Sequence, residues 1–426
     1  MKKPNILLLI AFLLSACAPA TTVVPTSAST ETSTPAPTAT QIPSPTPTII
    51  PSPTQIGGSS GRLIFAYASA EFKNDFPELQ GESNVFMANL DGSNQTPITD
   101  GLNGNNELAA VSPDGTRAII HSWNKKISDL YLVDLNDLAA EPVRLVPDAT
   151  AAKWLDNQRI IYIGQGEQDF GIYTVNADGS DPVNLEHGDR DQPVEILAIS
   201  KDRVYWSSVV DTVRNDKKHT YAYYPWWTSL DGTETGRLRY AGRPISTHNF
   251  RGRNLAFSPD GTRLAWVEAG TPDSIHPYGS YLHIASVSDT EYPLSVDLIS
   301  SFVDLKWRSD GKSLLVFDLG SVARSDPNSS NYGFYEVSAD SGKVLKNYHL
   351  SDEAMIGLNA PSLQCSDASP DDQILPCLMF GTEKNADGYS IAKLNFLDLK
   401  TMTFSEASGF HFLFMGWDAR QIAWVP

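Results

Sequence analysis

Residues 255–267 read L-A-F-S-P-D-G-T-R-L-A-W-V, and this stretch decides the fold. Pro259 sets φ for the second position of a type I turn, Asp260 favours the third, and Gly261 accepts the positive φ that often follows. Short apolar runs rich in aromatic residues lie on both sides of this turn. Such runs, bounded by turn residues, are typical of strands rather than helices. The stretch therefore predicts two short strands joined by a tight turn.

Two kinds of turn recur from residue 62 to the end of the chain. The first is S-P-D-G at 112–115 and 258–261, S-D-G at 309–311 and S-P-D-D at 369–372, with degenerate copies at 155–157, 200–202 and 417–419. The second is a D-G-S-like turn at 91–93, 178–180 and 231–233, with degenerate copies at 136–137, 288–289, 340–342 and 398–400. The two kinds alternate strictly, and successive repeats are roughly 40 to 60 residues apart, which is typical of four-stranded propeller blades.

The runs S-P-D-G-T-R-L-A-W and I-Y-T-V-N-A-D-G-S resemble those of TolB-type, WD-like β-propellers. The resemblance extends over residues 62–426; it is strong at 111–120, 172–180 and 255–267 and weak between 192 and 243. It implies an all-β propeller fold. It carries no catalytic residues, because the repeated motifs of the family are structural turns. A pair of β-sandwiches is the alternative, and the alternation of two turn types argues against it.

The seven copies of each turn predict seven four-stranded blades, with six or eight left open by the two ends of the chain. Residues 62–67 resemble a second strand that lacks its first strand. Residues 412–425 resemble a first and a second strand that lack the others. We expect both ends to share one blade, so that the termini close the ring. Because both ends offer a second strand, one of these is surplus.

The first 60 residues predict export and a tether. Lys2 and Lys3 precede an apolar core, residues 6–14, that is too short to span a bilayer. L-S-A-C at 14–17 resembles a bacterial lipobox, which implies a diacylglycerol group on Cys17 and cleavage before it; an ordinary secretory signal is the alternative. Residues 18–60 are rich in Thr, Pro, Ser and Ala, which predicts a disordered, extended linker. Residues 61–426 then form a single propeller domain outside the cytoplasm, anchored to the membrane through Cys17 alone.

Charge and cysteine content restrict the partners and the compartment. With 32 basic and 50 acidic residues, the net charge is −18, which argues against nucleic acid as a partner. Cys365 and Cys377 flank the turn at 369–372, and two strands meeting across that turn would bring them together. In an exported chain this predicts a disulfide, with two reduced, buried cysteines as the alternative.

The sequence offers no convincing catalytic motif. G-G-S-S-G at 57–61 matches the G-x-S-x-G pattern of serine hydrolases, but that motif requires a strand before it and a helix after it. Its position at the end of the tether indicates flexible linker instead. H-E-x-x-H, C-x-x-C and a phosphate-binding glycine loop do not occur in the sequence. We therefore expect no cofactor and no metal site, and we leave enzymatic activity open, favouring none.

The order of the strands predicts where a binding site lies. Both kinds of tight turn fall at one end of the blades, so the longer connections, 69–82, 209–219, 269–280 and 319–332, fall at the other. Long loops on a rigid scaffold usually carry recognition. We expect the site on this long-loop face, near the central channel.

The segment 221–227 has the most unusual local composition of the chain. Its aromatic residues are Tyr221, Tyr223, Tyr224, Trp226 and Trp227. Such side chains stack on sugar rings or anchor a protein partner when exposed. The alternative is packing, and alternation along a strand places one of the two tryptophans in the core.

Two polar inter-blade loops are weaker candidates for binding. One carries His187 with Asp189, Arg190 and Asp191, and the other carries Arg243, His248 and Asn249. The first loop lacks the spaced oxygen ligands of a calcium loop.

Together these features predict a lipid-anchored, monomeric propeller that acts as a binding or scaffolding module for an envelope or extracellular protein. The alternatives are a carbohydrate-binding propeller that takes an oligosaccharide, and a propeller hydrolase or lyase with a site at the channel mouth.

Overall fold

The computed structural model describes the following residues: 61–67, 70–73, 76–79, 83–125, 128–166, 169–187, 193–213, 219–240, 243–245, 247–248, 255–269, 280–298, 303–318, 333–349, 363–384, 390–401, 403–407, 410, 412–413 and 422–425. All of them belong to one compact unit, residues 53–426. The targeting segment, Cys17 and the linker 18–60 lie outside the described residues. Every regular element that the structure describes is a strand, and no described segment forms a helix able to cross a membrane.

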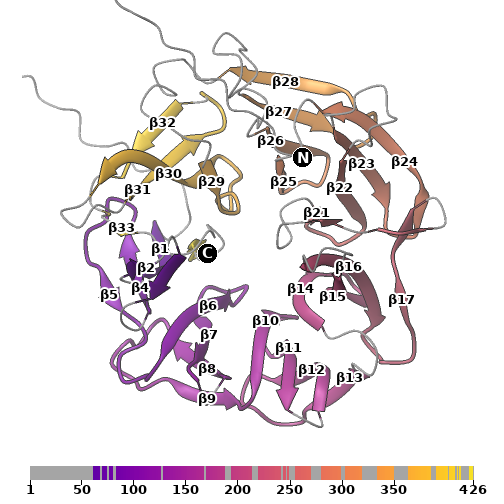
Figure 1. Cartoon of the computed structure of the whole chain (residues 1–426). Helices are drawn as coiled ribbons and strands as arrows, with labels where there is room; N and C mark the ends of the chain where they lie inside the picture. The colour runs from indigo at the N-terminus through magenta and orange to yellow at the C-terminus, as the bar shows by residue number, and fades with distance from the viewer. Residues whose placement is uncertain are drawn as a thin grey trace, which may run out of the picture. The chain divides into compact units, whose positions relative to one another are not determined.

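Seven four-stranded antiparallel sheets follow one another around a ring (Figure 1). We number these blades in chain order and name the strands of each from the inside outward. Blade 1 contains β34 (Ile422–Trp424), β1 (Arg62–Tyr67), β4 (Asn84–Asn89) and β5 (Thr96–Pro97). Blade 2 contains β6 (Asn105–Val111), β7 (Arg117–Trp123), β8 (Ser128–Asp134) and β9 (Val143–Val146). Blade 3 contains β10 (Ala149–Trp154), β11 (Arg159–Gly166), β12 (Asp169–Asn176) and β13 (Val183–His187).

The other four blades have the same order. Blade 4 contains β14 (Pro193–Ile199), β15 (Arg203–Val213), β16 (His219–Ser229) and β17 (Thr235–Arg237). Blade 5 contains β21 (Leu255–Phe257), β22 (Arg263–Ala269), β23 (Ser280–Ser286) and β24 (Asp289–Leu298). Blade 6 contains β25 (Val303–Trp307), β26 (Ser313–Asp318), β27 (Gly333–Ser338) and β28 (Val344–His349). Blade 7 contains β29 (Leu363–Cys365), β30 (Ile374–Lys384), β31 (Ser390–Asp398) and β32 (Thr403–Glu406).

Short strands complete the described connections. β2 (Ala70–Lys73) and β3 (Phe76–Leu79) form a hairpin between β1 and β4. β18 (Arg239–Tyr240) pairs with β19 (Arg243–Pro244), and β20 (Thr247–His248) pairs with β16. β33 (Phe412–Leu413) pairs with β31.

The predicted turn at 258–261 joins β21 to β22. Its Ser258 hydroxyl donates to Asp260 Oδ1 at 2.6 Å, and the Thr262 amide donates to the same oxygen at 3.0 Å. Gly261 has a φ of 66°, in the left-handed region that glycine tolerates. The side chains therefore stabilise the same turn geometry that the Pro-Asp-Gly backbone favours.

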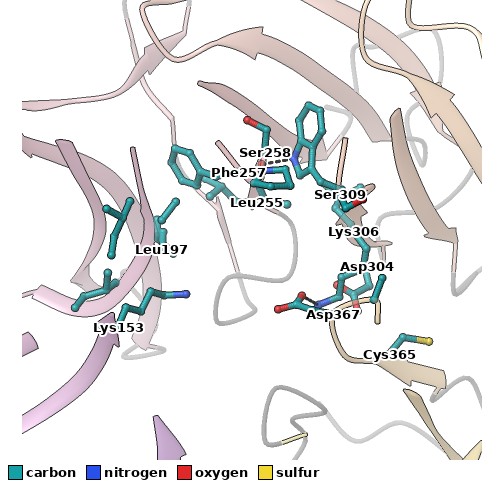
Figure 2. A pocket seen from close by; sticks show the side chains of 18 of the residues that line it. Lys153, Leu197, Leu255, Phe257, Ser258, Asp304, Lys306, Ser309, Cys365 and Asp367 are labelled. Atoms are coloured by element: carbon teal, nitrogen blue, oxygen red, sulfur yellow. Dashed lines mark hydrogen bonds and ion pairs between the residues drawn. The ribbon is translucent and has the colours of Figure 1, made fainter. Parts of the chain in front are cut away.

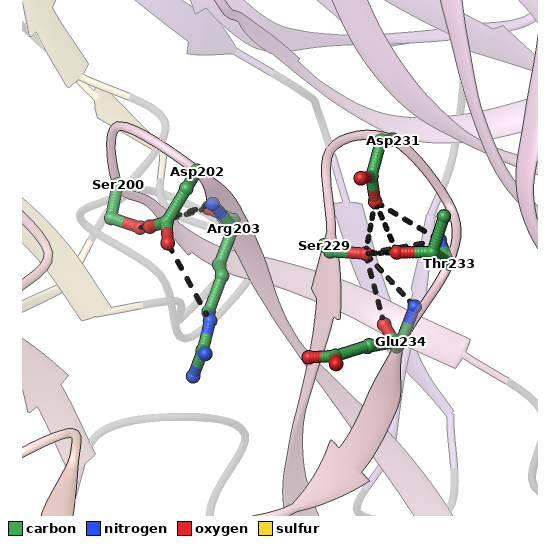
Figure 3. A network of polar contacts seen from close by, with 7 residues as sticks. All are labelled: Ser200, Asp202, Arg203, Ser229, Asp231, Thr233 and Glu234. Carbon is green, nitrogen blue, oxygen red and sulfur yellow. Dashed lines mark hydrogen bonds and ion pairs between the residues drawn. The ribbon is translucent and has the colours of Figure 1, made fainter.

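Both kinds of tight turn lie at the same end of a blade. Figure 3 shows the two turns of blade 4 side by side, with Ser229 and Thr233 both hydrogen-bonded to Asp231 in the second turn. The amide of Leu230 donates across to the carbonyl of Asp202 in the first turn at 2.9 Å. The same bond recurs in blades 2, 3, 5, 6 and 7, from Leu135, Ala177, Val287, Ala339 and Leu399. The remaining connections therefore lie at the opposite, long-loop end.

One expected loop is partly strand. Residues 209–219 continue the β15–β16 hairpin, whose register runs without interruption to Val213↔His219. β-Branched and aromatic residues, which favour strands, continue past the blade in the sequences of both strands. Residues 214–218, and the predicted loop regions 270–279 and 319–332, lie outside the described residues.

Adjacent blades pack face to face through apolar side chains. Ile119 of blade 2 belongs to one buried cluster with Trp154 of blade 3, and Tyr205 of blade 4 belongs to another with Trp266 of blade 5. At the closure, Trp424 joins a cluster that includes Phe396 of blade 7. Burial between blades, rather than within one, therefore supplies the core.

The chain ends close the ring in blade 1. β34 supplies the innermost strand, with Leu63 opposite Trp424, and the amide of Val425 donates to the carbonyl of Arg62 at 3.1 Å. The expected second strand within 412–425 is therefore the innermost strand, β34, and the expected first strand lies elsewhere, as β33 at the side of blade 7. The blade count is therefore seven, and the six- and eight-blade alternatives are excluded.

The structure joins Cys365 and Cys377 by a disulfide, with the two residues directly opposite each other in β29 and β30. Both are buried, at 3% and 0% exposure.

Candidate functional site

A cavity of about 620 Å³ lies between the innermost strands of the ring. Its walls are the innermost strands of five consecutive blades, β10, β14, β21, β25 and β29, and the turns that follow them. The charged residues of the lining are Lys153, Glu195, Asp304, Lys306, Asp367 and Asp372. Apolar side chains, among them Leu197, Leu255 and Phe257, lie between them. We call this cavity the channel.

One backbone hydrogen bond aligns all seven blades at the channel. In blades 2 to 7, an amide one to four residues after the innermost strand donates across the tight turn to the next strand: Ser112 to Arg117, Leu155 to Arg159, Ser200 to Arg203, Ser258 to Arg263, Arg308 to Ser313 and Ser369 to Ile374. In blade 1, where no turn joins the two strands, the amide of Val425 after β34 donates to the carbonyl of Arg62 at the start of β1. The residue two places before each donor therefore occupies an equivalent position. These residues are Ala110, Lys153, Ala198, Ala256, Lys306, Asp367 and Ala423, which we call the channel ring. Four of them are alanine, so small side chains keep this level of the channel wide.

The two cations of the channel ring differ in their surroundings. The Lys306 ammonium lies 3.4 Å from Asp367 Oδ1 of the next blade. Figure 2 shows Lys153 reaching into the cavity from β10, with Asp304, Lys306 and Asp367 on the opposite wall. Among the described residues, the Lys153 ammonium has no ion pair and no hydrogen bond. The channel thus carries both charge signs on opposing walls.

A second ion pair joins blades 6 and 7 at the edge of the cavity. Arg308 Nε lies 2.8 Å from Asp372 Oδ2. Burial raises the pKa of Asp372, and the Arg308 guanidinium opposes this effect by favouring the carboxylate. This pair is a contact between blades rather than an open ligand site, since both side chains are largely buried.

The predicted aromatic segment lies on β16, where its tryptophans pack. The Trp226 ring stacks on Trp206 of β15 at 5.3 Å, and the Arg237 guanidinium of β17 lies 4.5 Å from its other side. Because β16 runs between β15 and β17, both faces of the Trp226 indole contact protein groups. Trp227 packs into the cluster between blades 4 and 5, under the Arg203 guanidinium.

The three tyrosines of the predicted aromatic segment differ in their contacts and exposure. Tyr224 lies 4.9 Å from the Arg237 guanidinium, on the same side of the blade as Trp226. Tyr223 is half-buried on the same strand. Tyr221 also lies on β16, and its side chain is outside the described residues. Neither Tyr223 nor Tyr224 lines the channel cavity.

The inter-blade candidates are placed only by their backbones. His187 ends β13, Arg243 pairs with Tyr240, and His248 pairs with Ala222 of β16. The structure therefore brings His248 to the aromatic strand and leaves His187 on another blade. Asp189, Arg190, Asp191 and Asn249 lie outside the described residues.

Blade 5 contains a hydrogen-bonded series of three polar side chains that the sequence did not predict. The Ser295 hydroxyl lies 2.9 Å from His283 Nδ1, and His283 Nε2 lies 3.2 Å from Glu268 Oε2. His283 is 3% exposed, between Trp266 and Tyr240. The three residues lie on neighbouring strands, and only the register of the two hairpins brings them together. No short motif could have revealed them.

Metal-binding potential can be assessed over the described residues. No group of three or more His, Cys, Asp or Glu side chains there is arranged to hold a metal ion.

Comparison with known proteins yields fold neighbours at low identity. No protein-family model matches the chain, and no curated protein matches it. Oligogalacturonate lyase from Vibrio parahaemolyticus is similar with a TM-score of 0.47 and 9% identity, over 81% of this chain and 85% of the other. The β-propeller domain of the Trilobed protease from Pyrococcus furiosus is similar with a TM-score of 0.43 and 12% identity, over 81% of this chain and 92% of the other. TolB from Acinetobacter baumannii is similar with a TM-score of 0.36 and 13% identity, over 68% of this chain and 66% of the other. Such identities concern the fold alone, and it is the seven four-stranded sheets of this chain that make it a seven-bladed β-propeller.

Proposed function

We propose that the protein is a binding module that takes an extended peptide segment of a protein partner into its channel. The observation that carries this proposal is the channel itself, a cavity of about 620 Å³ built from five innermost strands. Strands position side chains rigidly, so little conformational entropy is lost when a ligand binds.

The lining suits a peptide. Leu197, Leu255 and Phe257 offer apolar surface, while Lys153 and Asp304 offer opposite charges. A peptide presents apolar and charged side chains along one chain, so it can match such a mixed wall. The alanines of the channel ring leave room for its backbone.

A retention experiment tests this proposal. The full chain carrying Cys17→Ser is immobilised and exposed to a random library of acetylated hexapeptides, and the retained peptides are sequenced by mass spectrometry. Ala256→Trp fills the channel ring and should abolish retention of the peptides that the parent chain selects. Ala140→Trp, at an exposed position, is the matched control and should retain them. Retention of the same peptides by Ala256→Trp would place binding elsewhere and contradict the proposal.

We also propose that the module is exported and held at the membrane by a lipid on Cys17. The lipobox-like L-S-A-C at 14–17 and the proline-rich tether support this. Cys17→Ser should move the protein from the membrane fraction to the soluble fraction in the producing bacterium. Unchanged membrane association would refute the anchor.

A hydrolase is the second candidate. It is favoured by the hydrogen-bonded series of side chains Ser295, His283 and Glu268. A hydroxyl bonded to an imidazole that a carboxylate orients is the general arrangement of an activated nucleophile. A fluorophosphonate probe separates the two candidates. Labelling of the wild-type chain that Ser295→Ala removes would support the hydrolase, whereas the binding module predicts no labelling at Ser295.

A further inference from the structure

We propose that Lys153 is the anion-binding position of the channel and holds a carboxylate of the bound peptide. This inference rests on the proposed function and identifies the chemistry of its ligand. It follows from a comparison of two blades of the same ring.

Blades 3 and 6 carry the same pair of residues at the same place. Lys153-Trp154 ends β10 and Lys306-Trp307 ends β25, and in each blade the turn-spanning amide follows at once, from Leu155 or Arg308. Both lysines belong to the channel ring and both line the cavity. The two cations therefore start from equivalent backbone positions.

The neighbouring blade gives the two lysines different partners. Next to Lys306, the equivalent residue of blade 7 is Asp367, whose Oδ1 lies 3.4 Å from the ammonium. Next to Lys153, the equivalent residue of blade 4 is Ala198, whose methyl group can neither accept a hydrogen bond nor carry charge. The protein thus neutralises one lysine of the channel ring from within and leaves the other without a described partner.

The surroundings of Lys153 favour a ligand over solvent as its counter-charge. Lys153 is half-buried, and Leu197 of β14 lies beside it in the cavity (Figure 2), which Ile196 of the same strand also lines. Apolar walls lower the local dielectric and strengthen a charge pair relative to water. Glu195 lines the same cavity from β14, yet no ion pair between it and Lys153 is found among the described residues. Asp304 and Asp367 lie on the opposite wall.

The sign of the protein's charge makes this position selective. At a net charge of −18, the chain repels anions in general. A carboxylate is therefore accepted only where a local cation compensates, and in the channel that cation is Lys153. The carboxylate comes from an acidic side chain or from a free C-terminus of the peptide.

Small probes test the anion position independently of peptide binding. The lysines of the full chain carrying Cys17→Ser are dimethylated with ¹³C, which keeps their charge, and the Lys153 signal is assigned from its loss in Lys153→Arg. Glutarate should shift this signal, whereas the uncharged glutaramide should not. The exposed Lys201 at a tight turn is the internal control and should not respond. An unmoved Lys153 signal under glutarate overturns the inference, whether or not peptides bind.

Peptide probes then test the ligand class by titration calorimetry. Three acetylated pentapeptides differ only in charge: Ala-Ala-Glu-Ala-Ala amide, Ala-Ala-Gln-Ala-Ala amide, and the latter with a free C-terminus. We expect one or both carboxylate probes to bind at least about tenfold more tightly than the neutral probe, which is the scale of one charge-assisted bond. Equal binding of all three contradicts the inference but leaves peptide binding intact. A glutarate response without any peptide binding contradicts the proposed function instead.

The comparison of blades 3 and 6 suggests one variant that should weaken carboxylate binding and one that should strengthen it. Ala198→Asp gives Lys153 the partner that Lys306 already has, so it should abolish the carboxylate preference without altering the lysine. Asp367→Ala removes the carboxylate paired with Lys306 and should strengthen binding of the carboxylate probes. Lys201→Gln is the matched control for a lost positive charge. A carboxylate preference that survives both Lys153→Gln and Ala198→Asp overturns the inference.

Discussion

At the scale of the residue, the tight turns depend on one aspartate each. In blade 2, Asp114 Oδ1 accepts from the Ser112 hydroxyl at 2.6 Å, from the Thr116 amide at 3.0 Å and from the Thr116 hydroxyl at 2.8 Å. These bonds, the one from Ser112 first, lower the pKa of Asp114 to about 2. The sequence predicted the turn from the backbone preferences of Pro, Asp and Gly. It did not predict the serine and threonine bonds, because these depend on the folded turn itself.

Asp114→Asn tests this contribution through pH. The pKa of the folded state lies below the ordinary value of 3.8, so the stabilisation is complete at neutral pH and is lost as pH falls from about 4 to about 2. For a carboxylate this exposed, we expect about 1 kcal/mol at pH 7, after allowance for solvent screening. Chemical unfolding from pH 2 to pH 7 should show a steeper decline for the wild type than for the variant. Parallel pH profiles would contradict the proposed role.

At the scale of the element, each turn also packs on a neighbouring blade. A Cβ added to Gly261 would lie 2.9 Å from Ser200 Cβ and 3.0 Å from the carbonyl oxygen of Ile199 in blade 4. Gly311 occupies the same place in the next blade with nearly the same φ, 65° against 66°, but its nearest contact would be 4.0 Å away. The two glycines therefore share a backbone requirement and differ in the approach of the neighbour.

Alanine at each position separates these two effects. Gly311→Ala should lose about 1 kcal/mol, the cost of a non-glycine residue at positive φ. Gly261→Ala should lose about 1–3 kcal/mol more, because it also overpacks the contact between blades. Urea unfolding of both variants measures the difference. Equal losses would show that the approach of blade 4 carries no energetic weight.

At the scale of the whole molecule, the closure joins strands from opposite ends of the chain. β34 pairs with β1 over three residues, and two further bonds hold it to blade 7: the Ser366 hydroxyl donates to the carbonyl of Ile422, and Trp424 Nε1 donates to the carbonyl of Asp367 at 3.2 Å. Ser366 and Asp367 directly follow Cys365. The disulfide thus fixes the strand on which the closing strand depends.

Replacing both Cys365 and Cys377 by alanine should therefore weaken the whole ring. Because the cysteines are 12 residues apart, we expect a loss of about 2–3 kcal/mol in urea unfolding. A reducing agent should destabilise the wild type and leave the double variant unchanged. A mass for the exported wild-type protein that corresponds to two free thiols would contradict the disulfide.

Local chemistry determined most of the architecture in advance. Turn residues such as Pro259 and Gly261, and the apolar runs around them, predict the strands, the alternating turns and the seven-blade count, because turn geometry and strand alternation act over a few residues. The same logic placed the two ends of the chain in one blade. It assigned the innermost strand to the wrong terminal segment, since β33 and β34 are both short apolar runs and only their pairing distinguishes them.

Only the tertiary structure decided what the channel presents. Lys153 and Lys306 are alike in sequence, and their difference arises from the neighbouring blade, where Ala198 or Asp367 stands at the equivalent place. The packing of both faces of the Trp226 ring, and the hydrogen bonds of His283, depend in the same way on strand register. Sequence therefore determined the repeated unit, because a blade is built from local contacts. The packing of one blade against the next determined the candidate site, because its residues meet only when the ring is closed.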